Sequence, residues 1–289
     1  MASDHVWTVA ESLEWTVGYF ERAGVESPRR SAEWLLSAAT GLSRVELYAH
    51  FDQPLTPQER SAFRVSIERR AKGEPLQYVT GEVAFRHLIL KVEPGVFIPR
   101  PETEVLVDEA LAALPQGGVA IDLCTGSGAV AVSLAFERPD VTVFATELSP
   151  ATAAVARANA ERAGVADRVT ILAGDLFAPL PAELKGTADV VVANPPYIPS
   201  DDLPALPAEV AAFEPHLALD GGPDGLDVAR RIIEDSRAWL KSGCVLLMEL
   251  DTDHVKSAVR IMASWYEDCE VRPDLTGRDR IAAGRTRRV

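Results

Sequence analysis

Residues 188–197 read Ala-Asp-Val-Val-Val-Ala-Asn-Pro-Pro-Tyr, an apolar run that ends at two prolines. The run is short and rich in β-branched residues, which is typical of a strand buried on both faces of a parallel sheet. The prolines end the strand because they lack the N–H that a sheet needs, and the residue before a proline is restricted to extended conformations. In an open α/β sheet, ligands bind at the carboxyl ends of the strands. The stretch therefore predicts an α/β fold with a binding site at residue 194.

The groups that follow this strand suit the binding of a planar NH2 group. The Asn194 side-chain oxygen and the Pro195 carbonyl can each accept one N–H, the two prolines stiffen the backbone, and Tyr197 can cover the plane. The alternative is a proline-rich turn in which the asparagine caps its own backbone. The candidate catalytic residues are Asn194, Pro195, Pro196 and Tyr197.

A second group of residues suits a nucleotide-like cofactor. Residues 122–129, Asp-Leu-Cys-Thr-Gly-Ser-Gly-Ala, join a predicted strand to a helix, and glycines there let the backbone turn tightly and approach a ligand. Glu147 ends the next predicted strand and can accept hydrogen bonds from ribose hydroxyls. At the end of the third, Asp175 can accept from an adenine amino group and Leu176 can pack on the ring. The candidate cofactor-binding residues are Cys124, Thr125, Gly126, Ser127, Gly128, Glu147, Asp175, Leu176 and Asn194.

The glycine loop alone leaves a second cofactor open. Gly126-x-Gly128-x-x-Ala131, with Glu147 at the end of the next strand, also fits the dinucleotide fingerprint of NAD-dependent dehydrogenases. Hydride transfer, however, has no evident use for Asn-Pro-Pro-Tyr. A tight strand-to-helix turn without any ligand is the third possibility.

Strands and helices alternate along the second part of the chain, which predicts a mainly parallel sheet with helices on both faces. The last two strands are joined by a short turn, so one of them must run antiparallel. The predicted strands are 119–123, 141–146, 169–173, 190–193, 244–250, 270–272 and 280–283; the predicted helices are 101–111, 129–136, 149–163, 228–240 and 255–265.

The first part of the chain has a different pattern. Helical periodicity appears near 6–23, 29–40 and 56–70, and we expect Trp7, Trp15, Trp34 and Tyr48 in the core of this unit. Glycines and prolines then separate short β-prone pieces around 77–80 and 85–92, which predict a β-hairpin. The expected domains are a helical unit for substrate recognition over 1–75, a β-hairpin linker over 76–98 and a catalytic domain over 99–289.

Composition narrows the function classes. The net charge of −14 argues against nucleic acid as the partner, because its phosphates demand a basic surface. The three cysteines and five histidines show no metal-ligand spacing, no apolar run is long enough to span a membrane, and the first residues lack signal-peptide features. We therefore expect no metal, no membrane and a cytoplasmic location.

Asn-Pro-Pro-Tyr at 194–197 resembles the signature of amino-group methyltransferases, which use S-adenosylmethionine, and the strand count resembles their seven-stranded Rossmann-like fold. Further segments resemble one family among them, the glutamine-N5 methyltransferases of peptide chain release factors. These segments are 73–78, 97–104, 213–215, 218–222, 225–227 and 277–280.

The resemblance implies a fold, a reaction and a partner. It implies methyl transfer to the glutamine of the Gly-Gly-Gln motif in class-1 release factors, with S-adenosylhomocysteine as the product, and a helical unit that helps to hold the release factor. A family that methylates a ribosomal-protein glutamine shares the same signature, and adenine N6 presents the same planar NH2, so both remain open. The chain departs from the usual family pattern at Cys124, where glycine is common, and at Glu147, Leu176 and His216.

Overall fold

The computed structural model describes residues 5–288, which form two compact units. The helical unit comprises 5–82 and 208–213, and the sheet unit comprises 83–207 and 214–288. Each unit has its own hydrophobic core, so each is described by itself.

The helical unit packs its helices around a small core of aliphatic residues with Phe20 and Phe63. Three of its helices begin with capping boxes, in which Thr8, Ser43 and Thr56 each accept from a backbone N–H three residues later. The helices are α1 (Val9–Arg22), α2 (Pro28–Thr40), α3 (Arg44–Ala49), α4 (Pro57–Ala71), α5 (Leu76–Thr80) and α9 (Ala208–Phe213).

Several expectations for this region are wrong. Trp15 and Tyr48 are each 49% exposed: Trp15 stacks on Tyr19 at the surface, and aliphatic residues fill the core instead. The segment predicted as a β-prone piece at 77–80 is helix α5, because a glycine with a left-handed φ of 79° at position 81 ends a helical turn there. Helix α3 was not predicted, although its capping box, Ser43 with Glu46, marks its start.

A two-stranded sheet at the start of the sheet unit forms the predicted hairpin, with different bounds. Strands β1 (Glu82–Phe85) and β2 (Leu88–Lys91) are joined at Arg86, whose guanidinium forms ion pairs with Asp108 at 2.8 Å and Glu137 at 2.5 Å. Phe85, Leu88 and Leu90 of the hairpin pack into the core of the sheet unit, while Ile89 is exposed.

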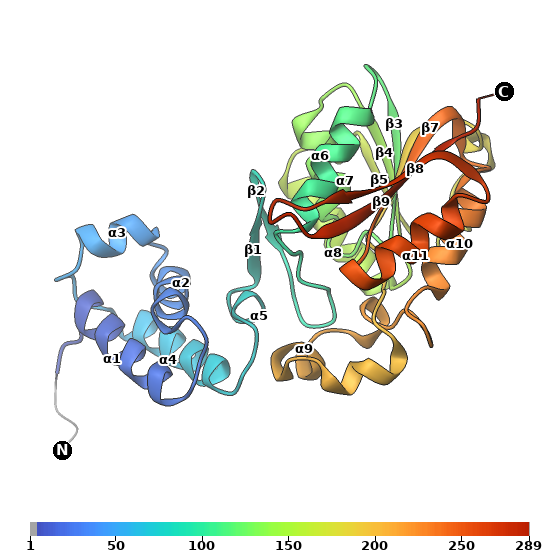
Figure 1. Ribbon diagram of the computed structural model, residues 1–289. Helices are drawn as coiled ribbons and strands as arrows, with labels where there is room; N and C mark the ends of the chain where they lie inside the picture. The colour runs from blue at the N-terminus through green and yellow to red at the C-terminus, as the bar shows by residue number, and fades with distance from the viewer. Residues whose placement is uncertain (1–4, 289) are drawn as a thin grey trace. The chain divides into compact units, whose positions relative to one another are not determined.

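The main sheet has seven strands in the order β5-β4-β3-β6-β7-β9-β8 (Figure 1). Its first five strands are parallel, and β9 runs antiparallel to both of its neighbours, which confirms the seven-stranded, mostly parallel sheet. The strands are β3 (Val119–Leu123), β4 (Thr142–Glu147), β5 (Val169–Ala173), β6 (Ala188–Ala193), β7 (Leu240–Glu249), β8 (Tyr266–Pro273) and β9 (Asp279–Thr286).

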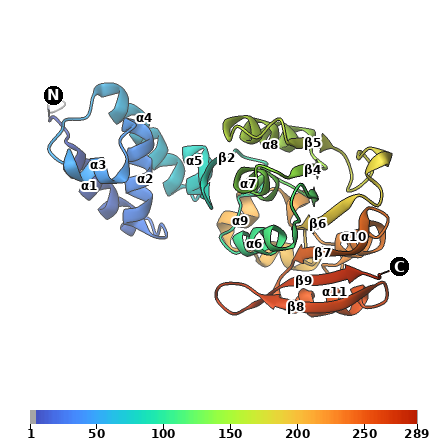
Figure 2. The same ribbon diagram turned by 90° about the horizontal axis from the view of Figure 1, so that it is seen from above.

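Helices cover both faces of this sheet (Figure 2). Side chains alternate along each strand: Ala120 and Val190 pack into one core, while Ile121 and Val191 pack into the other. Every residue of β6 is buried, as its apolar sequence predicts. One face is covered by α6 (Thr103–Ala113), α7 (Ala129–Glu137) and α8 (Pro150–Arg162), and the other by α10 (Asp227–Ser236) and α11 (Thr252–Met262).

Helices α6, α10 and α11 differ in their bounds from the predicted 101–111, 228–240 and 255–265, and α10 differs most. The helix expected over 228–240 ends at Ser236, because tight backbone hydrogen bonds from Ala238 and Trp239 turn the chain into β7. Trp239 then stacks on Phe177 with ring centroids 5.4 Å apart, so the apolar residues at this point belong to the core beyond the helix.

The long segment after β6 folds back beside the strand end. The N–H of Ile198 donates to the carbonyl of Leu219 at 2.9 Å, and the N–H of Gly221 donates back to the carbonyl of Ile198 at 2.8 Å. The segment contains short 3-10 helices at Ser200–Ala205 and His216–Ala218. Residues 219–221 therefore lie beside Ile198.

Candidate active site

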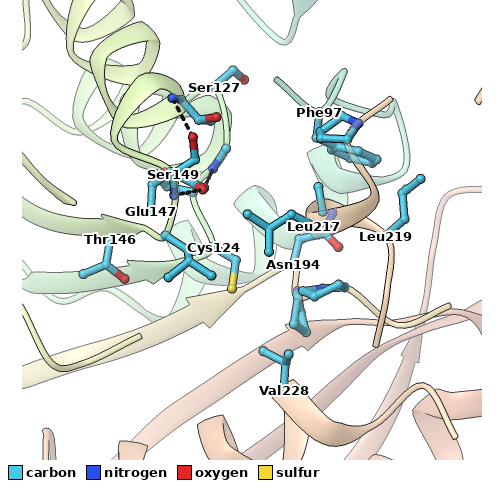
Figure 3. Close-up of a pocket in the computed structure, with 18 of the residues that line it drawn as sticks. Phe97, Cys124, Ser127, Thr146, Glu147, Ser149, Asn194, Leu217, Leu219 and Val228 are labelled. Atoms are coloured by element: carbon cyan, nitrogen blue, oxygen red, sulfur yellow. Dashed lines mark hydrogen bonds between the residues drawn. The ribbon is translucent and has the colours of Figure 1, made fainter. Parts of the chain in front are cut away.

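A pocket of about 320 Å³ lies at the carboxyl ends of β3, β4, β5 and β6, within the sheet unit (Figure 3). This is the volume range of small-ligand sites. Figure 3 shows Glu147 and Ser149 on one side of the pocket, Asn194, Leu217 and Phe97 on the other, and Cys124 between them. The pocket is lined by all the sequence-predicted site residues except Gly128.

The loop after β3 forms the floor of the pocket in an unusual backbone conformation. Cys124 and Gly126 both have a left-handed φ of 56°, and the N–H of Thr125 donates to the carbonyl of Thr146 at 3.0 Å. A non-glycine residue such as Cys124 is strained in this region, where glycine carries no steric penalty. Burial raises the pKa of the Cys124 thiol above its usual range, so the thiol stays protonated at neutral pH.

The two glycines of this loop have different tasks. A Cβ on Gly126 would meet no atom within 4 Å, and Gly126 faces the pocket. Gly128 has a φ of 83° and starts α7, and a Cβ there would lie 3.2 Å from the Cβ of Ala156 and 3.3 Å from Cγ2 of Val132. Gly128 therefore permits close packing of α7 against α8.

We expect Gly128→Ala to destabilise the protein more than Gly126→Ala. Both variants place a Cβ in a left-handed conformation, but only Gly128→Ala also crowds a packed helix contact, which typically costs about 1–3 kcal/mol. Urea unfolding measures the difference, with Gly126→Ala as the matched control. Equal free energies of unfolding would show that α8 moves aside at no cost.

Glu147 fastens the glycine loop to the end of β4. Its Oε2 accepts from the N–H of Gly126 at 3.0 Å, and its Oε1 accepts from the N–H of Ser149 at 2.9 Å. Burial raises the pKa of this carboxyl, and the backbone N–H groups oppose the rise. Each oxygen keeps a further lone pair, so the side chain can also accept from hydroxyls in the pocket.

Asp122 is a pocket residue that sequence reasoning did not select. It is 1% exposed, and its Oδ2 accepts from the Thr125 hydroxyl at 2.6 Å and from the N–H of Ala131 at 3.1 Å. Burial raises its pKa to about 7. The sequence could have indicated Asp122, because it is the first residue of the 122–129 stretch. Its hydrogen bonds to Thr125 and Ala131 could be recognised only in the folded structure.

Asp175 and Leu176 lie at the opening of the pocket after β5. The Asp175 carboxylate accepts from Nη2 of Arg231 on α10 at 2.6 Å, and Arg231 also lines the pocket. Leu176 is buried with a left-handed φ of 45° and packs into the core. The ion pair occupies Oδ2 of Asp175 and leaves Oδ1 for a ligand.

The Asn194 side chain is oriented by a contact that crosses the fold. Its Nδ2 donates to the hydroxyl of Thr103, the first residue of α6, at 3.3 Å. Its Oδ1 accepts from no other described residue. Among residues 5–288, none donates a hydrogen bond to the Pro195 carbonyl either. Two acceptors thus stand unused at one point of the pocket lining.

Tyr197 and the segment 215–220 complete this side of the pocket. Tyr197 packs on the core, and burial raises its pKa, so its hydroxyl stays protonated. Leu217, more than half exposed, also faces the pocket. Phe97 lies opposite with the Arg100 guanidinium 4.9 Å from its ring centroid, and Arg100 pairs with the buried Glu214 at 2.5 Å. Leu217 and Phe97 were not predicted as site residues, whereas Tyr197 was.

The pocket fits the predicted methyl donor, S-adenosylmethionine. Ser127 Oγ and Thr146 Oγ1 line it, and both are buried without a hydrogen-bond partner within the described chain. Buried polar atoms without partners are rare, so these two indicate a polar ligand. The open space beside Gly126 and the lone pairs of Glu147 match the same ligand.

The described residues include no group of three or more His, Cys, Asp or Glu side chains arranged to hold a metal ion. No helix within the described range combines the length and apolar character that a membrane crossing requires.

Comparisons with known proteins agree with this geometry. Residues 11–81 match the family model "PrmC N-terminal domain", and residues 87–205 match "Methyltransferase small domain". A methyltransferase from Pyrococcus furiosus has a similar fold, with a TM-score of 0.52 at 18% identity over 69% of this chain and 89% of that one. The fold and the pocket thus define an S-adenosylmethionine-dependent methyltransferase.

Curated relatives identify the family. The release factor glutamine methyltransferase of Geobacter sulfurreducens is 45% identical over 97% of this chain and 97% of its own. That of Moorella thermoacetica is 45% identical over 94% of this chain and 96% of its own. The chain belongs to the release factor glutamine methyltransferase family. This confirms the predicted resemblance and removes the dehydrogenase alternative.

Proposed function

We propose that this protein transfers the methyl group of S-adenosylmethionine to the side-chain amide nitrogen of the glutamine in the Gly-Gly-Gln motif of class-1 release factors. The observation that carries the proposal is the pair of unused acceptors, Asn194 Oδ1 and the Pro195 carbonyl, in the pocket that fits the cofactor. The full-length relatives methylate release factor glutamine according to their names, which supports the same substrate here.

The proposed residue roles follow from the geometry. Gly126, Ser127 and Glu147 hold the cofactor, with Cys124, Thr125, Asp175 and Leu176 around them and Gly128 shaping the loop from outside the pocket. The bound cofactor supplies a methyl group made electrophilic by a positively charged sulfur. All other steps belong to the chain's own side chains and carbonyls.

The chain orients a poor nucleophile. An amide nitrogen is weakly nucleophilic because its lone pair is delocalised into the carbonyl. Asn194 Oδ1 and the Pro195 carbonyl accept the two amide hydrogens, which fixes the nitrogen and stabilises the positive charge that develops on it. As the N–CH3 bond forms and the bond from the methyl group to sulfur breaks, one of these two hydrogens leaves as a proton to solvent. Pro196 makes the backbone rigid, and Tyr197 covers the amide and excludes water. Orientation of this kind can lower a barrier by about 7 kcal/mol.

The test is mass spectrometry of the Gly-Gly-Gln peptide after incubation of a class-1 release factor with the enzyme and the cofactor. We expect a gain of one methyl group on the glutamine side chain. A release factor with that glutamine replaced by alanine is the matched control. An unmodified glutamine, with enzyme that binds the cofactor, would refute the substrate.

Labelled cofactor separates the two remaining substrates. Label in a ribosomal protein or in adenine of nucleic acid, with none in the release factor, would move the assignment to those substrates. The net charge of −14 supports protein over nucleic acid as the partner.

The remaining assignments rest on the same function. We place the protein in the cytoplasm, where release factors act, and assign release-factor recognition to the helical region 1–75. The hairpin region 76–98 links it to the catalytic region 99–289.

Removal of 1–75 is expected to raise the KM for the whole release factor more than for a short Gly-Gly-Gln peptide.

A further inference from the structure

Three elements bring a buried polar group behind Asn194. Thr103 starts α6 and is 4% exposed, Glu249 ends β7 and is 3% exposed, and Asn194 follows β6. Glu249 Oε2 has no hydrogen-bond partner within residues 5–288. A buried carboxylate without an ion partner is costly, so its retention next to the site calls for a reason.

The donor and acceptor roles of Thr103 and Glu249 determine which way the Asn194 side-chain amide is turned. The Thr103 oxygen accepts from Asn194 Nδ2 at 3.3 Å, so Oδ1, on the other arm of the amide, faces away from Thr103. The Thr103 hydroxyl also holds the pKa of the Glu249 carboxyl below the value that burial alone would give. An ionised Glu249 can only accept, so it favours a Thr103 that turns its proton toward the carboxylate and its lone pairs toward Asn194.

We propose that Thr103, with the Glu249 carboxylate behind it, is a positioning residue that keeps the oxygen of the Asn194 amide, and not its NH2, available to the substrate. A flipped Asn194 would present N–H groups to the N–H groups of the substrate amide and repel it. The proposal rests on the proposed function only for its kinetic consequence; the amide orientation itself is a property of the protein alone.

The orientation is expected to depend on pH. Burial raises the pKa of Glu249 to about 7, opposed by the Thr103 hydroxyl. Below that pH, protonated Glu249 can donate to Thr103, whose own proton then becomes available to Asn194 Oδ1. The titratable and charged groups that face this pair are Glu102 next to α6, Asp274 after β8, Arg280 on β9 and Tyr197 after β6.

The kinetic test compares three variants. Thr103→Val removes the hydroxyl at constant shape and should lower kcat about 10- to 100-fold with little change in cofactor affinity, as expected for a misplaced reacting group. Thr103→Ser restores the hydroxyl and should recover most of the rate. Thr187→Val is the matched control, because the Thr187 hydroxyl donates to the Leu184 carbonyl at 2.8 Å and does not line the pocket.

Two kinetic results would overturn the proposal. One is an unchanged kcat in Thr103→Val, and the other is a Thr103→Ser variant as slow as Thr103→Val. The pH profile adds a third readout: kcat of the wild type at saturating cofactor should fall as the pH drops through about 7, and Glu249→Gln should lose this dependence. If the pH profiles of kcat had the same shape in the wild type and in Glu249→Gln, Glu249 would have no part in orienting the Asn194 amide.

A spectroscopic test needs no turnover and so separates this proposal from the proposed function. The chain has only two asparagines, Asn159 and Asn194, so 15N-asparagine labelling gives two side-chain NH2 signals. Asn159 is an internal reference, since its Nδ2 donates to the carbonyls of Lys91 at 3.0 Å and Ser127 at 2.8 Å. Thr103→Val should shift the Asn194 NH2 signal and speed its exchange, and Thr103→Ser should not.

Unaltered Asn194 signals in Thr103→Val would refute the contact, whatever the enzyme methylates. Should Thr103→Val not fold, as an altered Asn159 signal would reveal, Glu249→Gln is measured in the same way. A wild type that shows the expected NMR response but leaves release factor unmethylated would refute only the proposed substrate.

Discussion

We expect Asn194→Ala to lose methyl transfer while it still binds the cofactor. The substitution removes the Oδ1 acceptor that we assign to one substrate N–H, and the Pro195 carbonyl alone cannot fix the amide plane. Loss of one group that stabilises charge in a transition state typically costs about 10²- to 10³-fold in kcat. We expect a decrease of this size in single-turnover methylation of release factor, while calorimetry detects cofactor binding close to that of the wild type.

Asn194→Asp tests the same contact from the other side. It keeps one oxygen acceptor but cannot donate to the Thr103 hydroxyl, so part of the activity should remain. An Asn194→Ala variant with full activity would refute the proposal that Asn194 binds the substrate amide. A variant that loses cofactor binding to the same extent as activity would assign Asn194 to the cofactor instead.

The sequence predicted the sheet and the strand-end motifs because each depends on local pattern. Residues 188–193 are apolar apart from Asp189 and include three consecutive valines, and all six are buried in a central strand. The stretches at 122–129, 147, 175–176 and 194–197 each follow a parallel strand, and parallel strands bring their carboxyl ends to one edge. Their convergence on one pocket therefore follows from the alternation of strands and helices.

The orienting residues could not be predicted because they depend on contacts between distant segments. Thr103 meets Asn194 across 91 positions, and Arg100 meets Glu214 across 114. Nothing in the local pattern around Thr103 distinguishes its hydroxyl from an ordinary first-turn residue of a helix. Gly128 shows the opposite case. The motif predicted it as a cofactor-binding residue, but it packs against atoms of α7 and α8 and does not line the pocket.

Glu147→Ala should weaken S-adenosylmethionine binding and leave the reaction of bound cofactor much less affected. The carboxylate holds the N–H groups of Gly126 at 3.0 Å and Ser149 at 2.9 Å, and its remaining lone pairs are assigned to the ribose hydroxyls. Hydrogen bonds to a charged group contribute about 1.5–3 kcal/mol each, so loss of one to the ligand should raise Kd about 10- to 100-fold.

Glu147→Gln separates the two tasks of this side chain. The amide oxygen can still accept from one partner, but its NH2 cannot accept from Gly126 or Ser149, so intermediate affinity is expected. Glu161→Ala, an exposed position on α8, is the control for loss of a carboxylate and should leave Kd unchanged. Calorimetry measures all three, and the wild-type affinity retained in Glu147→Ala would show that the ribose contact lies elsewhere. If Kd rises and kcat at saturating cofactor falls in Glu147→Ala, Glu147 acts by holding the glycine loop in shape, since a distorted loop would misplace the bound donor as well as weaken its binding.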